Sequence, residues 1–161
     1  LTLSGLPTRR FAFEAFLPME KKERKEILNE LVNETRTIII YEAPHKLVRT
    51  LKELRETLGN RRLTLCRELT KKHETAFHTT FDELIKKYES EKPLGECVLV
   101  IEGKSRQELK EEAVASWETI SIEEHMEIYE KQGLARKDAM KQVAKDRGMS
   151  KREIYQYLLK E

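Results

Sequence analysis

The pattern of apolar and polar positions predicts an α/β domain that ends near Lys104. Two runs rich in β-branched residues, 37–40 and 97–101, are typical of strands buried on both faces, as inside a parallel sheet. Elsewhere apolar residues recur every three or four positions, which predicts amphipathic helices. The helices are expected over 21–33, 47–58 and 81–90, and shorter strands over 11–16, 63–66 and 74–80. Strands that alternate with helices indicate an α/β architecture.

The pattern changes after this domain, which we assign to residues 1–104. Residues 105–119 carry several charges and show no clear periodicity, so we expect a linker there, with a helical turn around Trp117. Residues 120–161 predict short amphipathic helices separated by glycines, which indicates a small all-α domain.

The helical domain has features of a helix-turn-helix. A helix over 136–147 is followed by a turn at Gly148, and Ser150 with Glu153 makes a capping-box pattern before the next helix. Two basic helices joined by a short turn with a glycine resemble a DNA-binding arrangement. The alternative is a three-helix bundle used only for packing.

Charge is spread unevenly along the 161 residues, whose formal net charge is +2. Residues 105–133 carry 3 basic and 8 acidic side chains, whereas 134–161 carry 8 basic and 4 acidic ones. The basic segment could face a polyanion such as nucleic acid, or be a solvated helix surface. No apolar run reaches membrane-spanning length, so no membrane association is expected. Cys66 and Cys97 fall in apolar strands, which predicts buried free thiols in a reducing cytosol.

Polar side chains gather where two predicted strands end. Residues 42–45 follow the first buried run, and 67–71 follow the strand at 63–66. Ligands of open α/β sheets bind at the carboxyl ends of strands, so both clusters could line a cleft. The alternative for the first cluster is a tight strand-to-helix turn started by Pro44. The chain has no phosphate loop or Gly-rich dinucleotide fingerprint, and its histidines lack zinc-like spacing, so no metal site is expected.

Ordered motifs along the chain resemble one known family. They are Ser4-Gly5-Leu6-Pro7-Thr8 with Phe11 to Pro18, Tyr41-Glu42-Ala43-Pro44-His45-Lys46, Arg67-Glu68-Leu69-Thr70-Lys71 with His73-Glu74, and Gly95-Glu96 before a Val-rich strand. In this order they resemble the ribosomal small-subunit RNA methyltransferase I family of the tetrapyrrole methylase superfamily. The tail from Leu134 to Tyr155 resembles that family's C-terminal helical domain.

The resemblance implies a fold and a reaction. The fold is α/β, a mixed sheet flanked by helices, followed by a small helix-turn-helix-like domain. The reaction is methyl transfer from S-adenosylmethionine to the ribose 2′-oxygen of a cytidine in the 16S rRNA of the small ribosomal subunit. A cytoplasmic location and a homodimer are also implied.

The chain departs from the family pattern in three ways. Ala15 stands where the family has Gly, and Lys46 stands where it has Arg. The family also has a preceding domain with a Gly-rich loop that is important for cofactor binding. This chain begins at Leu1 without that domain, so we expect a fragment that folds, carries one wall of the cofactor cleft and is inactive alone.

Site residues follow from the matched motifs. The resemblance implies cofactor contacts from Ser4, Gly5, Glu42, Ala43, Glu68, Leu69, Thr70, Leu94 and Gly95. RNA contacts are expected from Arg67, Lys71, Arg136, Lys137, Lys141, Lys151 and Arg152. A base must accept the hydroxyl proton, and by chemistry alone the candidates are Glu42, Glu68 and His45. A structural salt bridge with Arg67 or Lys46 is the competing interpretation of the two glutamates.

Two other function classes remain open from the sequence. A methyltransferase for a small tetrapyrrole would share the fold, but it has no need of a basic helical appendage. A nucleic-acid-binding protein without catalysis would explain the tail, but it has no need of a cofactor wall at the strand ends.

Overall fold

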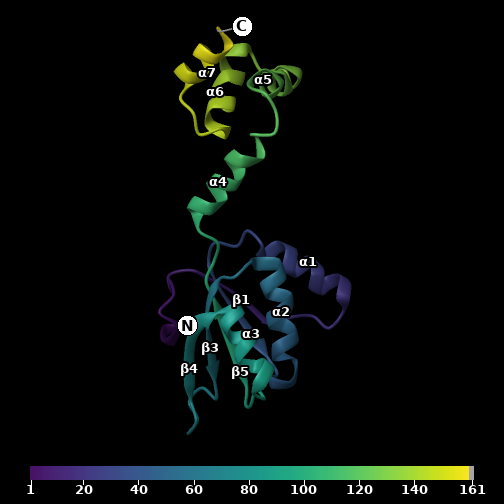
Figure 1. Ribbon diagram of the computed structural model, residues 1–161, viewed down its shortest axis with the longest axis vertical. Helices are drawn as coiled ribbons and strands as arrows, with labels where there is room; N and C mark the ends of the chain where they lie inside the picture. Colours follow the sequence, from purple (N-terminus) through teal and green to yellow (C-terminus); the bar gives the residue numbers. More distant parts are fainter. Residues whose placement is uncertain (160–161) are drawn as a thin grey trace. The chain divides into compact units, whose positions relative to one another are not determined.

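The computed structural model describes residues 1–159 and divides the chain into two compact units (Figure 1). The first unit is Leu1–Ser105 and the second is Arg106–Glu161. The split lies beside the boundary expected at Lys104. Each unit has its own apolar core and is described by itself below.

The first unit is built on a mixed five-stranded sheet, which confirms the predicted fold class. Its strands are β1 (Phe11–Phe16), β2 (Thr37–Glu42), β3 (Arg62–Arg67), β4 (Thr75–Thr80) and β5 (Cys97–Ile101), in the spatial order β1-β2-β5-β3-β4. β2 is parallel to β1 and antiparallel to β5, and the remaining pairs are antiparallel. The prediction that β2 lies inside a parallel sheet was therefore only half right. A strand that is apolar on both faces does not indicate whether its neighbours are parallel or antiparallel.

Three helices pack on one face of this sheet. They are α1 (Lys21–Leu31), α2 (Leu47–Leu58) and α3 (Phe81–Ser90). Alternation along β2 turns Ile38 and Ile40 toward them, where both side chains are fully buried. The α2 stripe of Leu47, Leu51 and Leu54 is equally buried, and each such side chain contributes about 1.5–3 kcal/mol of apolar burial.

None of these three helices packs on the opposite face, which we call the open face, and the N-terminal segment lies over part of it. A short turn of 3-10 helix, η1 (Thr2–Ser4), lies over β3, where the Thr64 hydroxyl donates to the Ser4 carbonyl at 3.3 Å. A small apolar cluster forms beneath this segment from Ile39, Cys66 and Val100, with Leu1, Leu6, Leu69 and Val98 packed against it. Cys66 lies on this face and Cys97 in the helix-covered core, so both thiols are free and buried as predicted.

The segment expected to be a linker contains helix α4 (Arg106–Ser116). None of its residues is buried, so the helix needs no apolar stripe. Without such a stripe, the periodicity of the sequence does not indicate a helix. It consists largely of strong helix formers such as Glu, Gln, Lys, Leu and Ala, and propensity alone favours a helix. The prediction of a helical turn only around Trp117 missed this helix for that reason.

The second unit ends in three short helices, α5 (Ile122–Lys131), α6 (Arg136–Asp146) and α7 (Lys151–Leu158). Their common core contains Ile122, Met126, Ala139, Met140, Val143, Ala144 and Ile154. The capping box of Ser150 and Glu153 is confirmed, and Gly148 between α6 and α7 has a φ of 61°, a left-handed value that glycine tolerates best.

A buried histidine ties these helices together. The His125 ring stacks on Trp117 with centroids 3.8 Å apart, and its Nδ1 accepts a hydrogen bond from Arg147 Nε at 3.1 Å. Its Nε2 lies 3.4 Å from Asp146, whose carboxylate also accepts the Tyr129 hydroxyl at 2.5 Å. Burial, and then the Arg147 charge, lower the pKa of His125. The imidazole is therefore neutral at neutral pH.

Candidate functional site

The ends of two strands meet at one edge of the sheet. Glu42 at the end of β2 and Arg67 at the end of β3 both pair with Cys97, the first residue of β5. Because β5 runs antiparallel to both neighbours, its start adjoins their carboxyl ends. The two polar clusters predicted at strand ends are thus brought together, with the turn that contains Gly95 between them.

Glu42 points into the helix-covered side of this edge and is buried. One carboxylate oxygen accepts the Ala43 N–H at 2.8 Å, and the other accepts the Thr50 hydroxyl at 2.6 Å. The Thr50 oxygen in turn accepts a hydrogen bond from Arg24 at 2.9 Å. The carboxylate is held by α2, and within residues 1–159 it makes no ion pair with Arg67 or Lys46.

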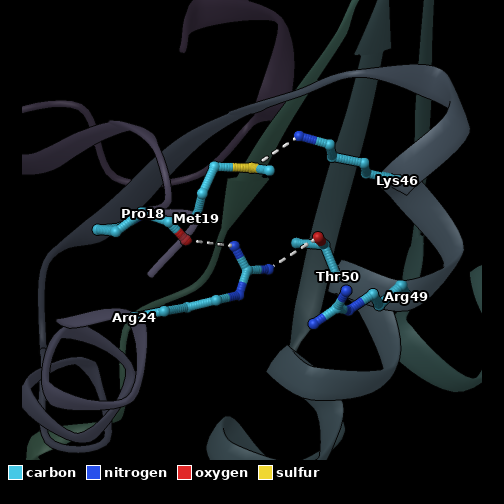
Figure 2. A pocket seen from close by; sticks show the side chains of 6 residues that line it. All are labelled: Pro18, Met19, Arg24, Lys46, Arg49 and Thr50. Carbon is cyan, nitrogen blue, oxygen red and sulfur yellow. Dashed lines mark hydrogen bonds between the residues drawn. The ribbon is translucent and has the colours of Figure 1, made fainter. Parts of the chain in front are cut away.

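A small pocket surrounds the Arg24 guanidinium (Figure 2). It has a volume of about 90 Å³ and is lined by Pro18, Met19, Arg24, Lys46, Arg49 and Thr50. Figure 2 shows Arg24 bridging the Pro18 carbonyl and the Thr50 hydroxyl. The Lys46 ammonium lies 2.9 Å from the Met19 sulfur. Arg24 also pairs with Glu53 at 2.7 Å. One network therefore joins the end of the β1 motif to the motif after β2.

Glu68 is fixed on the other side of the edge. Its carboxylate accepts the Glu96 N–H at 2.9 Å and lies 3.5 Å from the Lys71 ammonium. The Glu96 N–H, and then Lys71, lower the pKa of Glu68, so the group is ionised at neutral pH. Gly95 has a φ of 77°, and a Cβ there would overlap the Glu68 carboxylate. The close approach of Glu68 to this turn therefore requires glycine at position 95.

The backbone around Glu68 is strained. Glu68 and Thr70 have φ values of 49° and 63°, in a region that residues with a Cβ seldom occupy. Such strain costs about 1–3 kcal/mol for each residue and collects at functional sites. The same segment places Leu69 on the apolar cluster of the open face.

The remaining predicted site residues are distributed over two faces. Ser4 and Gly5 lie on the open face, where the Ser4 hydroxyl donates to the Leu1 carbonyl at 2.6 Å and accepts the Leu6 N–H. Their elements do not bring them to the carboxylate of Glu42, which points to the other side. His45 is exposed in the short η2 turn (Pro44–Lys46), and Leu94 is 70% exposed. Lys71 is paired with Glu96 at 3.0 Å.

In the second unit, a groove gathers most of the basic residues expected to contact RNA. It is lined by Arg136, Lys137, Met140, Lys151, Arg152 and Tyr155, and its volume is about 660 Å³. Lys141 is outside this lining, with its ammonium 3.0 Å from Asp138. The sequence analysis missed Met140 and Tyr155. A signal was present, because R-K-D-A-M and K-R-E-I-Y both place a basic pair one helical turn before a large apolar side chain.

A metal-binding cluster and a membrane-spanning helix are both absent from the part of the chain that the structure describes. There is no group of three His, Cys, Asp or Glu side chains that could hold a metal ion. No helix in it has the length and apolar character needed to cross a membrane.

Comparisons with known proteins bear on both units. A family model described as Tetrapyrrole (Corrin/Porphyrin) Methylases matches residues 2–85. "Ribosomal RNA small subunit methyltransferase I" of Halalkalibacterium halodurans and of Bacillus subtilis are each 42% identical over 155 residues, which cover 96% of this chain and 53% of the relative. The protein of the same name from Synechocystis is 38% identical over 160 residues, covering 99% and 56%. The chain spans about half the length of these relatives.

Proposed function

Because this chain belongs to the tetrapyrrole (corrin/porphyrin) methylase family, we propose that it is part of an S-adenosylmethionine-dependent methyltransferase acting on small-subunit ribosomal RNA. The similarity to relatives of that name extends through the tail, beyond the family-model match. One observation carries the choice of substrate, namely the basic groove of the tail. A small tetrapyrrole needs no such appendage, whereas an RNA polyanion is bound by one.

The proposed target is the ribose 2′-oxygen of a cytidine in 16S rRNA, as the sequence motifs imply. A cytoplasmic protein and a homodimer are proposed on the same basis.

The sheet edge and the open face would together form one wall for the cofactor. Leu69 and the exposed Leu94 offer apolar surface to a nucleoside. The Gly95 backbone follows Leu94 directly, and the Ala43 backbone follows Glu42 at the same edge. Glu68 presents a fixed carboxylate that could accept hydroxyl donors or balance a positive charge. The bound cofactor would supply an electrophilic methyl group. Ser4 and Gly5 would approach from the open face.

Holding the reactants in line supplies much of the rate of such a displacement. We assign Glu42 to positioning α2 and not to proton transfer, because both of its oxygens are already engaged by Thr50 and Ala43. Glu68 is a weak base, because its pKa is lowered. His45 is exposed beside the same edge, and an imidazole is the commonest general base, so we propose it as the proton acceptor.

A replacement experiment tests the reaction. Residues 1–161 are substituted for the matching segment of the Bacillus subtilis relative, and the hybrid is incubated with 30S subunits and methyl-labelled cofactor. The unmodified relative is the positive control, and cofactor binding by calorimetry reports whether the hybrid is folded. We expect label in 16S rRNA as a 2′-O-methylated cytidine, which resists alkaline cleavage.

The other outcomes separate the alternatives. Label in a porphyrinogen but not in rRNA would favour tetrapyrrole methylation. A hybrid that binds RNA and cofactor but transfers no methyl group to either acceptor would favour a binding protein. A His45→Ala hybrid that retains full activity would exclude His45 as the base.

A further inference from the structure

The groove between α6 and α7 combines two kinds of surface. It is lined by Met140 and Tyr155 and by four cationic residues. None of these described lining residues is acidic. A volume of about 660 Å³ lies within the range of about 300–1,000 Å³ typical of sites for small organic groups.

The geometry of the two helices produces this combination. On α6, Arg136 and Lys137 precede Met140 by four and three positions, and on α7, Lys151 and Arg152 precede Tyr155 in the same way. Side chains at these spacings lie on one face of a helix. Both basic pairs are in the first turn of their helices, so the helix dipoles add to the positive potential.

Among the described residues, three of the four cations that line the groove are free of ion pairs, and the fourth is not. Arg136 lies 3.6 Å from Glu130. Within residues 1–159, Lys137, Lys151 and Arg152 form no ion pair. Tyr155 lines the same groove and is 52% exposed. A ring that stays open between unpaired cations suits a ligand with both a flat face and negative charges.

We propose that this groove binds an unpaired nucleotide of RNA, with its base stacked on Tyr155 and the flanking phosphates held by Lys137, Lys151 and Arg152. The proposal rests on the proposed function for the identity of the nucleic acid as RNA. Stacking on an aromatic ring beside cations is the usual way in which proteins hold single strands. In a duplex both faces of each base are covered, so the ring would have no partner. The tail would thus recognise a single-stranded segment of the rRNA substrate.

Binding of a fluorescently labelled oligoribonucleotide to the 161-residue chain tests the proposal by anisotropy. Tyr155→Ala should weaken binding of the single strand by about 5- to 150-fold, which is the range found for loss of one stacked base. Tyr155→Phe keeps the ring and should stay within about twofold of wild type. Tyr157→Ala is the matched control, because Tyr157 is 45% exposed on the same helix but does not line the groove.

Two further probes make the test specific. An oligonucleotide of the same length with abasic sites should bind the wild type weakly and lose sensitivity to Tyr155→Ala. A duplex of the same sequence should bind less tightly than the single strand at equal salt. Fluorescence of Trp117, the single tryptophan, checks that each variant is folded.

The proposal is overturned if Tyr155→Ala binds the single strand as tightly as wild type, or if the duplex or the abasic strand is preferred. The binding experiment and the methyl-transfer assay can fail independently of each other. Ring-dependent binding supports the nucleotide site even if the hybrid enzyme transfers no methyl group to rRNA. Methyl transfer with ring-independent binding rejects the nucleotide site and leaves the reaction standing.

Discussion

At the scale of single residues, Ala15 and Glu42 show how the local structure limits the choice of side chain, the first through its backbone and the second through its hydrogen bonds. Ala15 follows a break in the pairing of β1 with β2, because the register shifts between Phe13 and Ala15 and leaves Glu14 without a paired residue. Its φ of 52° is left-handed, which costs a residue with a Cβ about 1–2 kcal/mol. This is the position where the family motif has Gly. The departure that the sequence analysis noted is therefore a strained one.

We expect Ala15→Gly to stabilise the first unit by about 0.5–1 kcal/mol, because relief of the strained φ exceeds the extra backbone entropy that glycine loses on folding. Urea unfolding followed by circular dichroism measures the change. Ala12→Gly is the matched control, since Ala12 is buried in the same strand and its φ is not left-handed, and it should be destabilising. A loss of stability in Ala15→Gly would contradict the strain argument.

Glu42 is the second position. We expect Glu42→Gln to lower the free energy of unfolding by about 1–3 kcal/mol, because the amide cannot accept from both Ala43 and Thr50 and one buried donor loses its acceptor. Glu68→Gln keeps an oxygen for the Glu96 N–H and should change stability by less than about 0.5 kcal/mol. Equal midpoints for the two variants in urea would argue against the role of Glu42 in positioning α2.

At the scale of elements, the sheet edge depends on the turn before β5. We expect Gly95→Ala to destabilise the first unit by more than about 2 kcal/mol, since the left-handed φ adds to the overlap with Glu68. In a Glu68→Ala background the overlap disappears, and the cost should fall to the backbone contribution of about 1–2 kcal/mol. A double-mutant cycle by urea unfolding measures this coupling. If the changes in the free energy of unfolding simply add, Gly95 and Glu68 do not contact each other.

The helices of the second unit are joined through His125, so their stability should depend on pH. Burial and Arg147 lower the pKa of His125 below its ordinary value of about 6.5. The unfolded chain then binds more protons than the folded one, so stability is complete above about pH 6.5 and falls as the pH decreases toward the folded pKa. Trp117 stacks on this ring, so thermal unfolding followed by its fluorescence reports the effect.

The control for this prediction is His125→Gln, which cannot be protonated. This variant should be less stable than the wild type at neutral pH, but its stability should depend less on pH between about pH 5 and 7. Identical slopes for wild type and variant would mean that a group other than His125 causes the pH dependence.

Local sequence determined much of what was predicted for these elements. The β2 run, the α2 stripe and the Ser150 capping box depend on neighbouring residues, and all three are confirmed. Helix α4 was missed because it buries nothing. The inward direction of Glu42 depends on its alternation in a paired strand, and the α6–α7 groove depends on contact between two helices. Such nonlocal features have no periodic signature. The sequence therefore indicated which elements carry the candidate residues but not the direction in which their side chains point.

At the scale of the whole molecule, binding of RNA should be governed by the charge of the groove. We expect Lys151→Ala with Arg152→Ala to weaken RNA binding and to reduce the slope of log affinity against log salt by about 1.4, since each lost phosphate contact to a single strand removes about 0.7. Lys131→Ala with Lys145→Ala removes the same charge outside the groove lining and should leave the slope nearly unchanged. Equal slopes for both double variants would exclude the groove as the phosphate-binding surface.

The place of β5 in the sheet has a consequence for synthesis of the chain. β5 is the last strand in sequence but the central one in space, between β2 and β3. Until Ile101 has been translated, β1–β2 and β3–β4 are two separate ladders, each with an open edge of unpaired N–H and C=O groups. The nascent domain therefore cannot close from its N-terminus onward. It passes through a stage that is exposed to aggregation, and its folding awaits the arrival of its final strand.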